Sequence, residues 1–269
     1  MKIKIISLFF LLGIIVIGNS QNKRDIQVLP AHAHNDYLHD RPLLDALDYK
    51  FKSIEADVYS IGDSLFVAHD FDKITSGRTL RELYLEPFKK IINKNNGSVN
   101  GNGEEIILLI DFKNDGMKTY KLLHQILQDY KEMLTTYCSG VKKAGAVSVI
   151  VSGNRPFEYM QQQEVRYAGY DGRIPELNVG ILPSLMPLVS DNWTNHFTWR
   201  GVGVMPAAEK EKLLQFVQMA KEKGYLLRFW STPENPKIEK ENVWAELKNA
   251  GVDLISTDDL EGLSEFFSK

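Results

Sequence analysis

The sequence contains very little cysteine, since Cys138 is the only one among 269 residues. A lone cysteine cannot form a disulfide within the chain, so a disulfide-stabilised scaffold is excluded and stability must come from the hydrophobic core. Positive charge is also scarce, because 32 lysines and arginines are outnumbered by 35 aspartates and glutamates. The formal net charge of −3 offers no concentrated positive charge to a phosphate backbone, and we expect no nucleic-acid partner.

The N-terminal apolar run, residues 5–17, is too short to cross a bilayer comfortably. It follows two lysines and precedes Gly18-Asn19-Ser20, which is the pattern of a secretory signal peptide. We expect residues 1–20 to be a signal peptide cleaved near Ser20-Gln21, in preference to an uncleaved anchor. The mature chain is then secreted or periplasmic, and losing the two lysines changes its formal charge from −3 to −5.

Residues 21–269 show no internal repeat, second domain or long linker, and we expect a single domain. Strand-like and helix-like segments alternate along them, which is typical of a parallel sheet. The predicted strands are residues 28–33, 53–59, 105–112, 147–152, 169–174, 179–182, 201–205, 226–230 and 254–256. The predicted helices are residues 42–49, 80–93, 117–137, 208–223, 241–250 and 260–267. About eight strands and this chain length favour closure into an α/β TIM (β/α)₈ barrel over an open doubly wound sheet.

Polar residues two positions apart occur at the ends of four predicted strands. Side chains two apart in a strand share a face, and active sites of these barrels gather at the C-terminal strand ends. The four pairs are His32 and His34, Glu55 and Asp57, Asp111 and Lys113, and Arg228 and Trp230. Carboxylate oxygens suit a hard cation such as Mg²⁺ or Ca²⁺, and an imidazole exchanges protons near neutral pH. The pattern therefore predicts a metal-assisted acid/base site for phosphate esters.

Three segments carry most of this chemistry, namely Ala31-His32-Ala33-His34-Asn35-Asp36-Tyr37, Ile54-Glu55-Ala56-Asp57-Val58 and Val67-Ala68-His69-Asp70. With Asp111-Phe112-Lys113, Arg228-Phe229-Trp230 and residues 251–258, they resemble the phosphatidylinositol-specific phospholipase C-like phosphodiesterase superfamily. The glycerophosphodiester phosphodiesterase branch is the nearest, and within it the altered inheritance of mitochondria protein 6 group is the most similar. The resemblance covers the chain from about residue 29 to its end. It implies a TIM barrel of the PLC-like phosphodiesterase type.

The resemblance also implies a role for individual residues. His32 and His69 are the expected catalytic acid/base pair, and a divalent cation, Mg²⁺ or Ca²⁺, is expected on Glu55, Asp57 and Asp111. The expected substrate-binding residues are Lys113, Arg228, Trp230, His34 and Asn35, although His34 could equally orient its neighbours. Typical members carry His-Arg-Gly where this chain has His32-Ala33-His34, so one phosphate-binding arginine is missing here.

The N-terminal signal pattern and the resemblance together imply an exported, metal-dependent phosphoric diester hydrolase. The expected substrate is a glycerophosphodiester or a phospholipid-type headgroup, with transient contact to a membrane surface. One alternative is a metal-dependent hydrolase of the amidohydrolase or polymerase-and-histidinol-phosphatase type that uses His32-x-His34. Such sites need further histidines at later strand ends, whereas the Glu-x-Asp oxygens favour a hard ion. The other alternative is a non-catalytic exported binding barrel. The sequence leaves the oligomeric state open.

Overall fold

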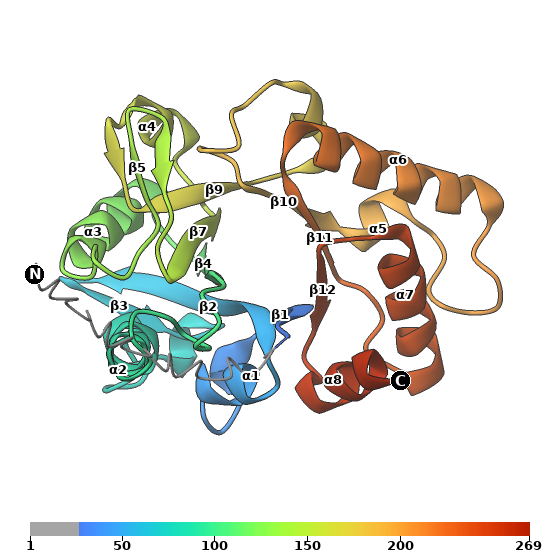
Figure 1. Ribbon diagram of the computed structural model, residues 1–269, viewed down its shortest axis with the longest axis horizontal. Helices are drawn as coiled ribbons and strands as arrows, with labels where there is room; N and C mark the ends of the chain where they lie inside the picture. The colour runs from blue at the N-terminus through green and yellow to red at the C-terminus, as the bar shows by residue number, and fades with distance from the viewer. Residues whose placement is uncertain (1–26) are drawn as a thin grey trace, which may run out of the picture.

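The strands of the protein form a closed barrel in the computed structural model, which describes residues 27–269 (Figure 1). Eight parallel strands pair in the order β1-β12-β11-β10-β9-β7-β4-β2, and β1 pairs with β2 to close the ring. These strands are β1 (Leu29–Ala33), β2 (Phe51–Ile61), β4 (Ile106–Phe112), β7 (Val147–Gly153), β9 (Ala168–Gly172), β10 (Leu188–Asn192), β11 (Leu226–Trp230) and β12 (Leu254–Thr257). The predicted TIM barrel is confirmed. The predicted signal peptide and its cleavage point lie outside the described residues.

Helices surround the ring of strands, as Figure 1 shows for α2, α3, α6, α7 and α8. The helices are α1 (Leu44–Asp48), α2 (Glu86–Lys94), α3 (Gly116–Gln128), α4 (Phe157–Gln162), α5 (Trp193–His196), α6 (Ala207–Lys223), α7 (Lys237–Ala250) and α8 (Leu260–Ser268). Shorter helical turns are η1 (Asp36–Leu38), η2 (Phe71–Lys73), η3 (Arg81–Leu85) and η4 (Ile174–Asn178). Within residues 27–269, no helix combines the length and apolar character that a bilayer span requires.

Two predicted strands are wrong, and one strand of the barrel was not predicted. Residues 179–182 and 201–205 form no strand, and glycines in the left-handed region interrupt both segments, with φ of 80° at Gly180 and 90° at Gly201. The missed strand is β10, whose sequence Leu-Val-Ser-Asp-Asn has only two apolar residues. Ser190 and Asp191 are nevertheless buried. Burial of polar side chains therefore hid this strand from a hydrophobic pattern.

The predicted helix 117–137 is too long, because α3 ends at Gln128. The residues that follow enter a small antiparallel sheet of β5 (Thr136–Cys138), β6 (Val141–Lys143) and β8 (Val165–Arg166). β8 lies beyond β7 in the sequence, so its pairing with β5 is a long-range contact. A local helical pattern cannot report a contact of that kind. A further strand, β3 (Ser64–Val67), pairs antiparallel with β2 as a hairpin on the barrel.

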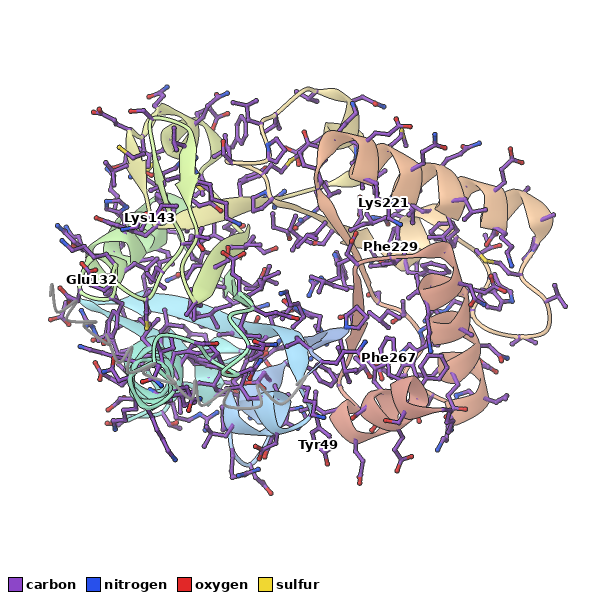
Figure 2. The ribbon with its side chains drawn as sticks, in the orientation of Figure 1. Tyr49, Glu132, Lys143, Lys221, Phe229 and Phe267 are labelled. Carbon is purple, nitrogen blue, oxygen red and sulfur yellow. The ribbon has the colours of Figure 1, made fainter. Side chains whose placement is uncertain are left out.

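The barrel interior changes from apolar to polar along the strand direction. Five buried side chains fill the lower part, and they are Ile107, Leu109, Ile150, Leu188 and Leu254. The strand register then places Glu55 beside Leu109 and Asp57 beside Asp111, on the next inward positions. A larger apolar cluster occupies the outer faces of the strands and the inner faces of the helices, where side chains fill the space between the layers (Figure 2). An apolar floor therefore supports a polar mouth at the C-terminal strand ends.

Candidate functional site

A polar cavity of about 310 Å³ opens at the C-terminal ends of the barrel strands. We call it the polar cavity, and its lining consists of His34, Glu55, His69, Asp111, Lys113, Ser152, Arg173, Arg228, Trp230 and Ser231. Seven of these are residues that the sequence predicted for the site. The other three predicted residues, His32, Asp57 and Asn35, contact the lining through hydrogen bonds. The alternation of side chains in each strand thus brings distant segments to one place, as expected.

Lys113 lies between two carboxylates at the cavity wall. Its Nζ is 2.9 Å from Asp57 Oδ2 and 2.7 Å from Asp111 Oδ2. Burial would lower the pKa of Lys113, but Asp57 and Asp111 outweigh burial and raise it above its usual value. Asp57 is fully buried, and burial together with the charge of Glu55 raises the pKa of its carboxyl group. The ammonium group is therefore a permanent positive charge at the place where the two carboxylates converge.

His69 is held by the same carboxylate and reaches into the polar cavity. Its Nδ1 is 3.0 Å from Asp57 Oδ2, and the hydroxyl of Tyr37 donates to that oxygen at 2.6 Å. An ionised carboxylate only accepts, so Nδ1 carries the hydrogen in that state and Nε2 is the nitrogen left for proton exchange. Because the His69 side chain is 55% exposed, its imidazole is accessible to a substrate.

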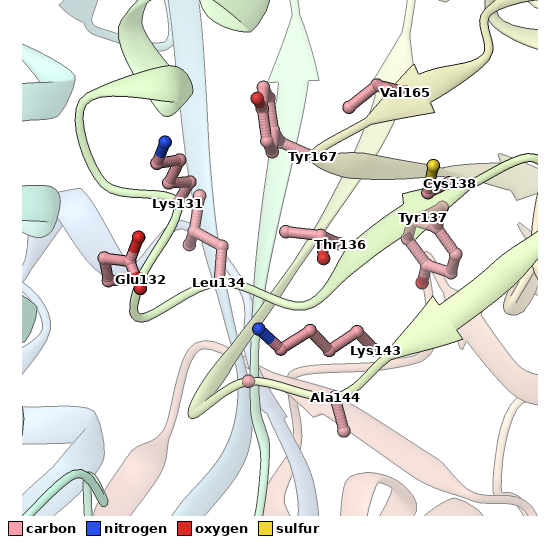
Figure 3. A pocket seen from close by; sticks show the side chains of 11 residues that line it. Lys131, Glu132, Leu134, Thr136, Tyr137, Cys138, Lys143, Ala144, Val165 and Tyr167 are labelled. Atoms are coloured by element: carbon pink, nitrogen blue, oxygen red, sulfur yellow. The ribbon is translucent and has the colours of Figure 1, made fainter.

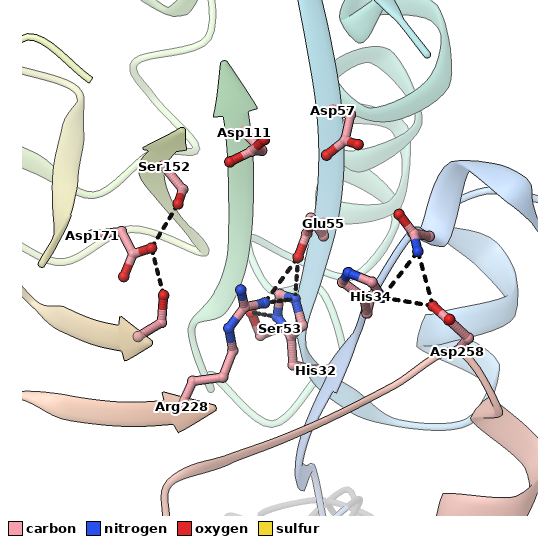
Figure 4. A network of polar contacts seen from close by, with 12 residues as sticks. His32, His34, Ser53, Glu55, Asp57, Asp111, Ser152, Asp171, Arg228 and Asp258 are labelled. Atoms are coloured by element: carbon pink, nitrogen blue, oxygen red, sulfur yellow. Dashed lines mark hydrogen bonds and ion pairs between the residues drawn. The ribbon is translucent and has the colours of Figure 1, made fainter. Parts of the chain in front are cut away.

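His32 lies beneath the polar cavity and has no exposed surface. Its Nδ1 is 2.7 Å from Ser53 Oγ and its Nε2 is 2.7 Å from Glu55 Oε2. Arg228 Nη1 contacts both His32 Nε2 and Glu55 Oε2, the latter at 2.9 Å (Figure 4). Burial and the charge of Arg228 lower the pKa of His32 to about 3, so the ring stays neutral. The sequence predicted His32 as one member of the acid/base pair, and in the structure its ring is enclosed by Ser53, Glu55 and Arg228.

Glu55 is engaged by the same cluster. Burial would raise the pKa of its carboxyl group, but Arg228 and His32 hold it well below the usual value. Glu55 is thus an ionised partner of Arg228 at the cavity floor.

His34 is the imidazole of the first motif that lines the polar cavity. Its Nδ1 is 2.8 Å from Asp258 Oδ1, and about a third of its side chain is exposed. Burial would lower the pKa of His34, but the hydrogen bond to Asp258 and the charges of Glu55 and Asp258 together outweigh burial and raise it. Asp258 follows the last barrel strand, which pairs with β1, so the closure of the barrel creates this contact. Asp258 is the last residue of the segment 251–258 that carries part of the resemblance, and the sequence indicated no role for it.

The turn after β1 explains why the chain carries Asn-Asp-Tyr at this point. Asn35 adopts a left-handed conformation with φ of 51°, which asparagine tolerates better than most residues. Its Nδ2 donates to Asp258 Oδ1 at 3.1 Å, and its Oδ1 accepts from the hydroxyl of Tyr37 at 2.8 Å. The turn therefore aims His34 at the cavity and Tyr37 at Asp57. Asn35, expected to bind substrate, holds this loop with both ends of its amide.

Arg173 is a cavity residue that sequence reasoning missed. Its Nη1 donates to Asp171 Oδ2 at 2.8 Å. That oxygen also accepts from Ser190 Oγ at 2.6 Å and, as Figure 4 shows, from Ser152 Oγ at 2.7 Å. This buried network fixes the guanidinium on the wall opposite β1. The available signal was its position, because Arg173 lies one residue before the end of the predicted strand 169–174. With Lys113 and Arg228, it gives the polar cavity three cationic side chains.

The carboxylates fit a hard cation in part. Among the described residues, no three His, Cys, Asp or Glu side chains are grouped as a metal site. Asp57 and Asp111 do converge on one point, the Nζ of Lys113. Asp57 Oδ1 is buried and has no hydrogen-bond partner among the described residues. Glu55 is instead paired with Arg228. The oxygens of Asp57 and Asp111 are therefore suited to Mg²⁺ or Ca²⁺, in a place that the ammonium group of Lys113 occupies.

A separate cavity of about 240 Å³ lies beside β5 and β6 (Figure 3). Lys131, Lys143 and Tyr167 are among its lining residues, together with the exposed Cys138. It shares no residue with the polar cavity and contains neither a histidine nor a pair of acids. Its lining therefore lacks the imidazole and the paired carboxylates that the polar cavity offers for acid/base catalysis.

The chain is similar to known proteins along most of its length. Residues 20–171 match the model of the AIM6-like phosphodiesterase domain family. The altered inheritance of mitochondria protein 6 homolog of Arthroderma benhamiae is 29% identical over 91% of this chain and 85% of its own. The protein of the same name from Eremothecium gossypii is 30% identical over 90% of this chain and 71% of its own. Among solved structures, phosphatidylinositol-specific phospholipase C from Listeria monocytogenes is 12% identical, with a TM-score of 0.46 over 83% of this chain and 81% of its own.

Proposed function

We propose that this chain, which belongs to the AIM6-like phosphodiesterase domain family, is an exported hydrolase of phosphoric diesters with a glycerophosphodiester or phospholipid-type headgroup. Membership supports phosphodiesterase-type hydrolysis in general. The observation that carries the finer proposal is the composition of the polar cavity, where two imidazoles and three cations face one space. Cations stabilise the negative charge of a phosphoryl group, and accessible imidazoles move protons near neutral pH.

The chain's own residues support a displacement at phosphorus. Lys113, Arg173 and Arg228 attract the phosphoryl oxygens from different walls of the polar cavity. A water molecule or a neighbouring substrate hydroxyl forms the new P–O bond while the bond to the leaving alcohol breaks. One imidazole accepts the proton of the attacking oxygen, and the other donates a proton to the leaving oxygen. General acid/base catalysis of this kind contributes roughly 10²–10⁴ in rate.

We assign the two proton-transfer positions to the imidazoles that line the cavity, His34 and His69. His32, which the sequence placed in the acid/base pair, has no exposed surface and contacts Ser53, Glu55 and Arg228. Its role in this proposal is to orient Glu55 and Arg228 below the phosphoryl group. Trp230 forms part of the cavity wall, as the sequence suggested.

A divalent cation, Mg²⁺ or Ca²⁺, belongs to the proposal. Asp57 and Asp111 would hold it once the ammonium group of Lys113 moves off their oxygens, and Glu55 could join them only by leaving Arg228. When bound, the cation would neutralise charge on the phosphoryl oxygens. The buried, unpartnered Oδ1 of Asp57 supports this assignment.

The alternative based on His32-x-His34 lacks supporting geometry. The two rings make different contacts, since His32 Nε2 is hydrogen-bonded to Glu55 and His34 Nδ1 is hydrogen-bonded to Asp258. Two other histidines lie elsewhere, with His124 packed against Tyr167 and His196 paired with Asp191. A non-catalytic binding barrel does not require two imidazoles that line one cavity and are each hydrogen-bonded to a carboxylate.

The test is a panel of phosphodiesters offered to the purified chain after chelation, with Mg²⁺ or Ca²⁺ added back separately. We expect glycerophosphodiesters or phospholipids to be cleaved to a free alcohol and a phosphomonoester or cyclic phosphate, and one cation to restore the activity. Cleavage of no diester with either cation would overturn the proposed function. Full activity in the presence of chelator would remove the cation from it.

A further inference from the structure

A second cavity, of about 440 Å³, opens on the other side of His69. We call it the arm cavity, and its lining consists of Asn35, Tyr37, Leu38, Val67, Ala68, His69, Asp70, Lys73 and Arg78. His69 lines both cavities. A diester whose phosphoryl group lies in the polar cavity therefore has a space for one of its two alcohol arms immediately beyond this imidazole.

The inner wall of the arm cavity is apolar. Tyr37, Val67 and Ala68 are 2%, 1% and 5% exposed, so they form the deep surface. Leu38 stands at the rim and is 70% exposed. Phe71, next to the lining residue Asp70, is 66% exposed. An apolar surface thus continues from the depth of the cavity to Leu38 at its rim, with Phe71 nearby in the sequence.

Most polar groups around the arm cavity already have partners. The Tyr37 hydroxyl donates to Asp57 Oδ2, and Arg78 Nη2 donates to the backbone oxygen of Tyr37. Lys73 lies at the exposed rim, with its Nζ 3.4 Å from Asp72. A polar alcohol placed here would lose its hydrogen bonds to water and gain few in return. A hydrocarbon chain has no such hydrogen bonds to lose, and its removal from water is favourable.

From these contacts we infer that the arm cavity binds an apolar alcohol arm of the substrate, a hydrocarbon chain carried on one ester oxygen. This inference rests on the proposed function and narrows its substrate class. The apolar arm belongs either to a soluble alkyl diester or to the acylglycerol part of a lipid. Both present the same chemistry to Val67 and Ala68, and the exposed Leu38 and Phe71 allow a longer chain to continue outward.

The experiment measures kcat/KM for glycerol phosphodiesters of methanol, butanol and octanol, with phosphorus NMR as the readout. We expect kcat/KM to rise with chain length, by up to about fourfold for each methylene that leaves water. The variant Leu38→Asn should lower kcat/KM for the octyl ester on the order of tenfold, and much less for the methyl ester. Leu38 is largely exposed, so this substitution spares the core.

The matched control is Leu182→Asn, the same change at a leucine that is 66% exposed and lines neither cavity. It should leave the whole series unchanged. Equal rates for all chain lengths, or an equal loss on methyl and octyl esters in Leu38→Asn, would overturn the inference while the proposed function stands. Cleavage of none of the three esters would overturn both.

A second measurement identifies the source of the apolar chain. Phosphatidylglycerol vesicles are offered beside the soluble octyl ester at equal diester concentration. Preferential cleavage of the vesicle lipid assigns the arm cavity to an acylglycerol, and preferential cleavage of the octyl ester assigns it to a free alkyl alcohol. In either case Leu38→Asn should reduce the preferred reaction.

Discussion

At the scale of single residues, three imidazoles near the barrel mouth have three different environments. His32 is enclosed and neutral, His34 is backed by Asp258, and His69 is backed by Asp57. A carboxylate that is hydrogen-bonded to an imidazole fixes the orientation of the ring. His34 and His69 line the polar cavity in this way, whereas His32 lies beneath it.

This difference predicts unequal effects of substitution. His34→Gln should lower kcat by roughly 10²–10⁴ and remove one limb of the pH–rate profile, because an amide does not titrate. His32→Gln should leave a bell-shaped profile and act mainly on KM, through Arg228. The measurement is the pH dependence of kcat and KM on one diester for both variants. A profile that loses a limb in His32→Gln and keeps it in His34→Gln would return the catalytic role to His32.

Arg173 offers a second prediction at this scale. The first motif of this chain contains no arginine, and Arg173, which directly follows β9, presents a guanidinium to the polar cavity. We expect Arg173→Gln to raise KM on the order of tenfold and to weaken inhibition by inorganic phosphate, since a hydrogen bond to a charged group contributes roughly 1.5–3 kcal/mol. Arg155→Gln is the control, because Arg155 packs over the Tyr170 ring and does not line the cavity. An unchanged KM and unchanged phosphate inhibition in Arg173→Gln would argue against this contact.

At the scale of structural elements, the connection between β1 and α1 is built around one buried carboxyl group. The backbone N–H of Leu43 and the hydroxyl of Tyr84 donate to Asp36 Oδ2 at 2.6 Å and 2.9 Å. Burial raises the pKa of Asp36 to about 7 from its ordinary 3.8, and the two hydrogen bonds only partly oppose burial. The loop that carries His34 and Tyr37 is therefore held by a group that is costly to ionise.

The raised pKa gives stability a defined pH dependence. The unfolded chain releases the proton near pH 4 and the folded chain near pH 7, so the free energy of unfolding falls between these values as pH rises. The loss amounts to about 1.4 kcal/mol for each unit of pKa difference. Asp36→Asn should flatten this part of the curve, as measured by urea unfolding from pH 4 to pH 8. Asp40→Asn, an exposed change in the same connection, should not flatten it. An Asp36→Asn curve as steep as that of the parent chain would contradict this account.

At the scale of the whole molecule, eight parallel strands bring residues from distant segments to a single mouth. Each strand contributes side chains at alternate positions, and the pairing of β1 with β12 brings His34 to Asp258. Lys113, Arg173 and Arg228 come from three separate strand ends. The site is therefore a property of the closed ring rather than of any one element.

Export is also a prediction about the whole molecule. A chain with a basic start and a short apolar segment should be processed near Ser20-Gln21 when it is expressed with its own N-terminus. Intact-mass analysis of the exported material should give a chain that begins at Gln21. Material that keeps Met1 would contradict cleavage. A chain produced without residues 1–20 should have the same activity, because the barrel begins at Leu29.

The sequence by itself determined the barrel and most of the site. Alternating β and α segments require parallel strands with helical crossovers, and period-two alternation puts Glu55 with Asp57 and Arg228 with Trp230 on one face. These are local properties of the chain. Six of the predicted residues that line the polar cavity belong to the four strand pairs, and His69 lies after the hairpin strand β3.

Only the tertiary structure decided which predicted residues face the substrate and which lie beneath it. His32 and His34 share a face, but the pairing of β1 with β2 and β12 encloses the first and leaves the second open. Pairing with β9 and β11 likewise made β10 a strand despite its polar sequence. Burial and electrostatic environment depend on neighbours that are far away in the sequence, and no local pattern encodes them.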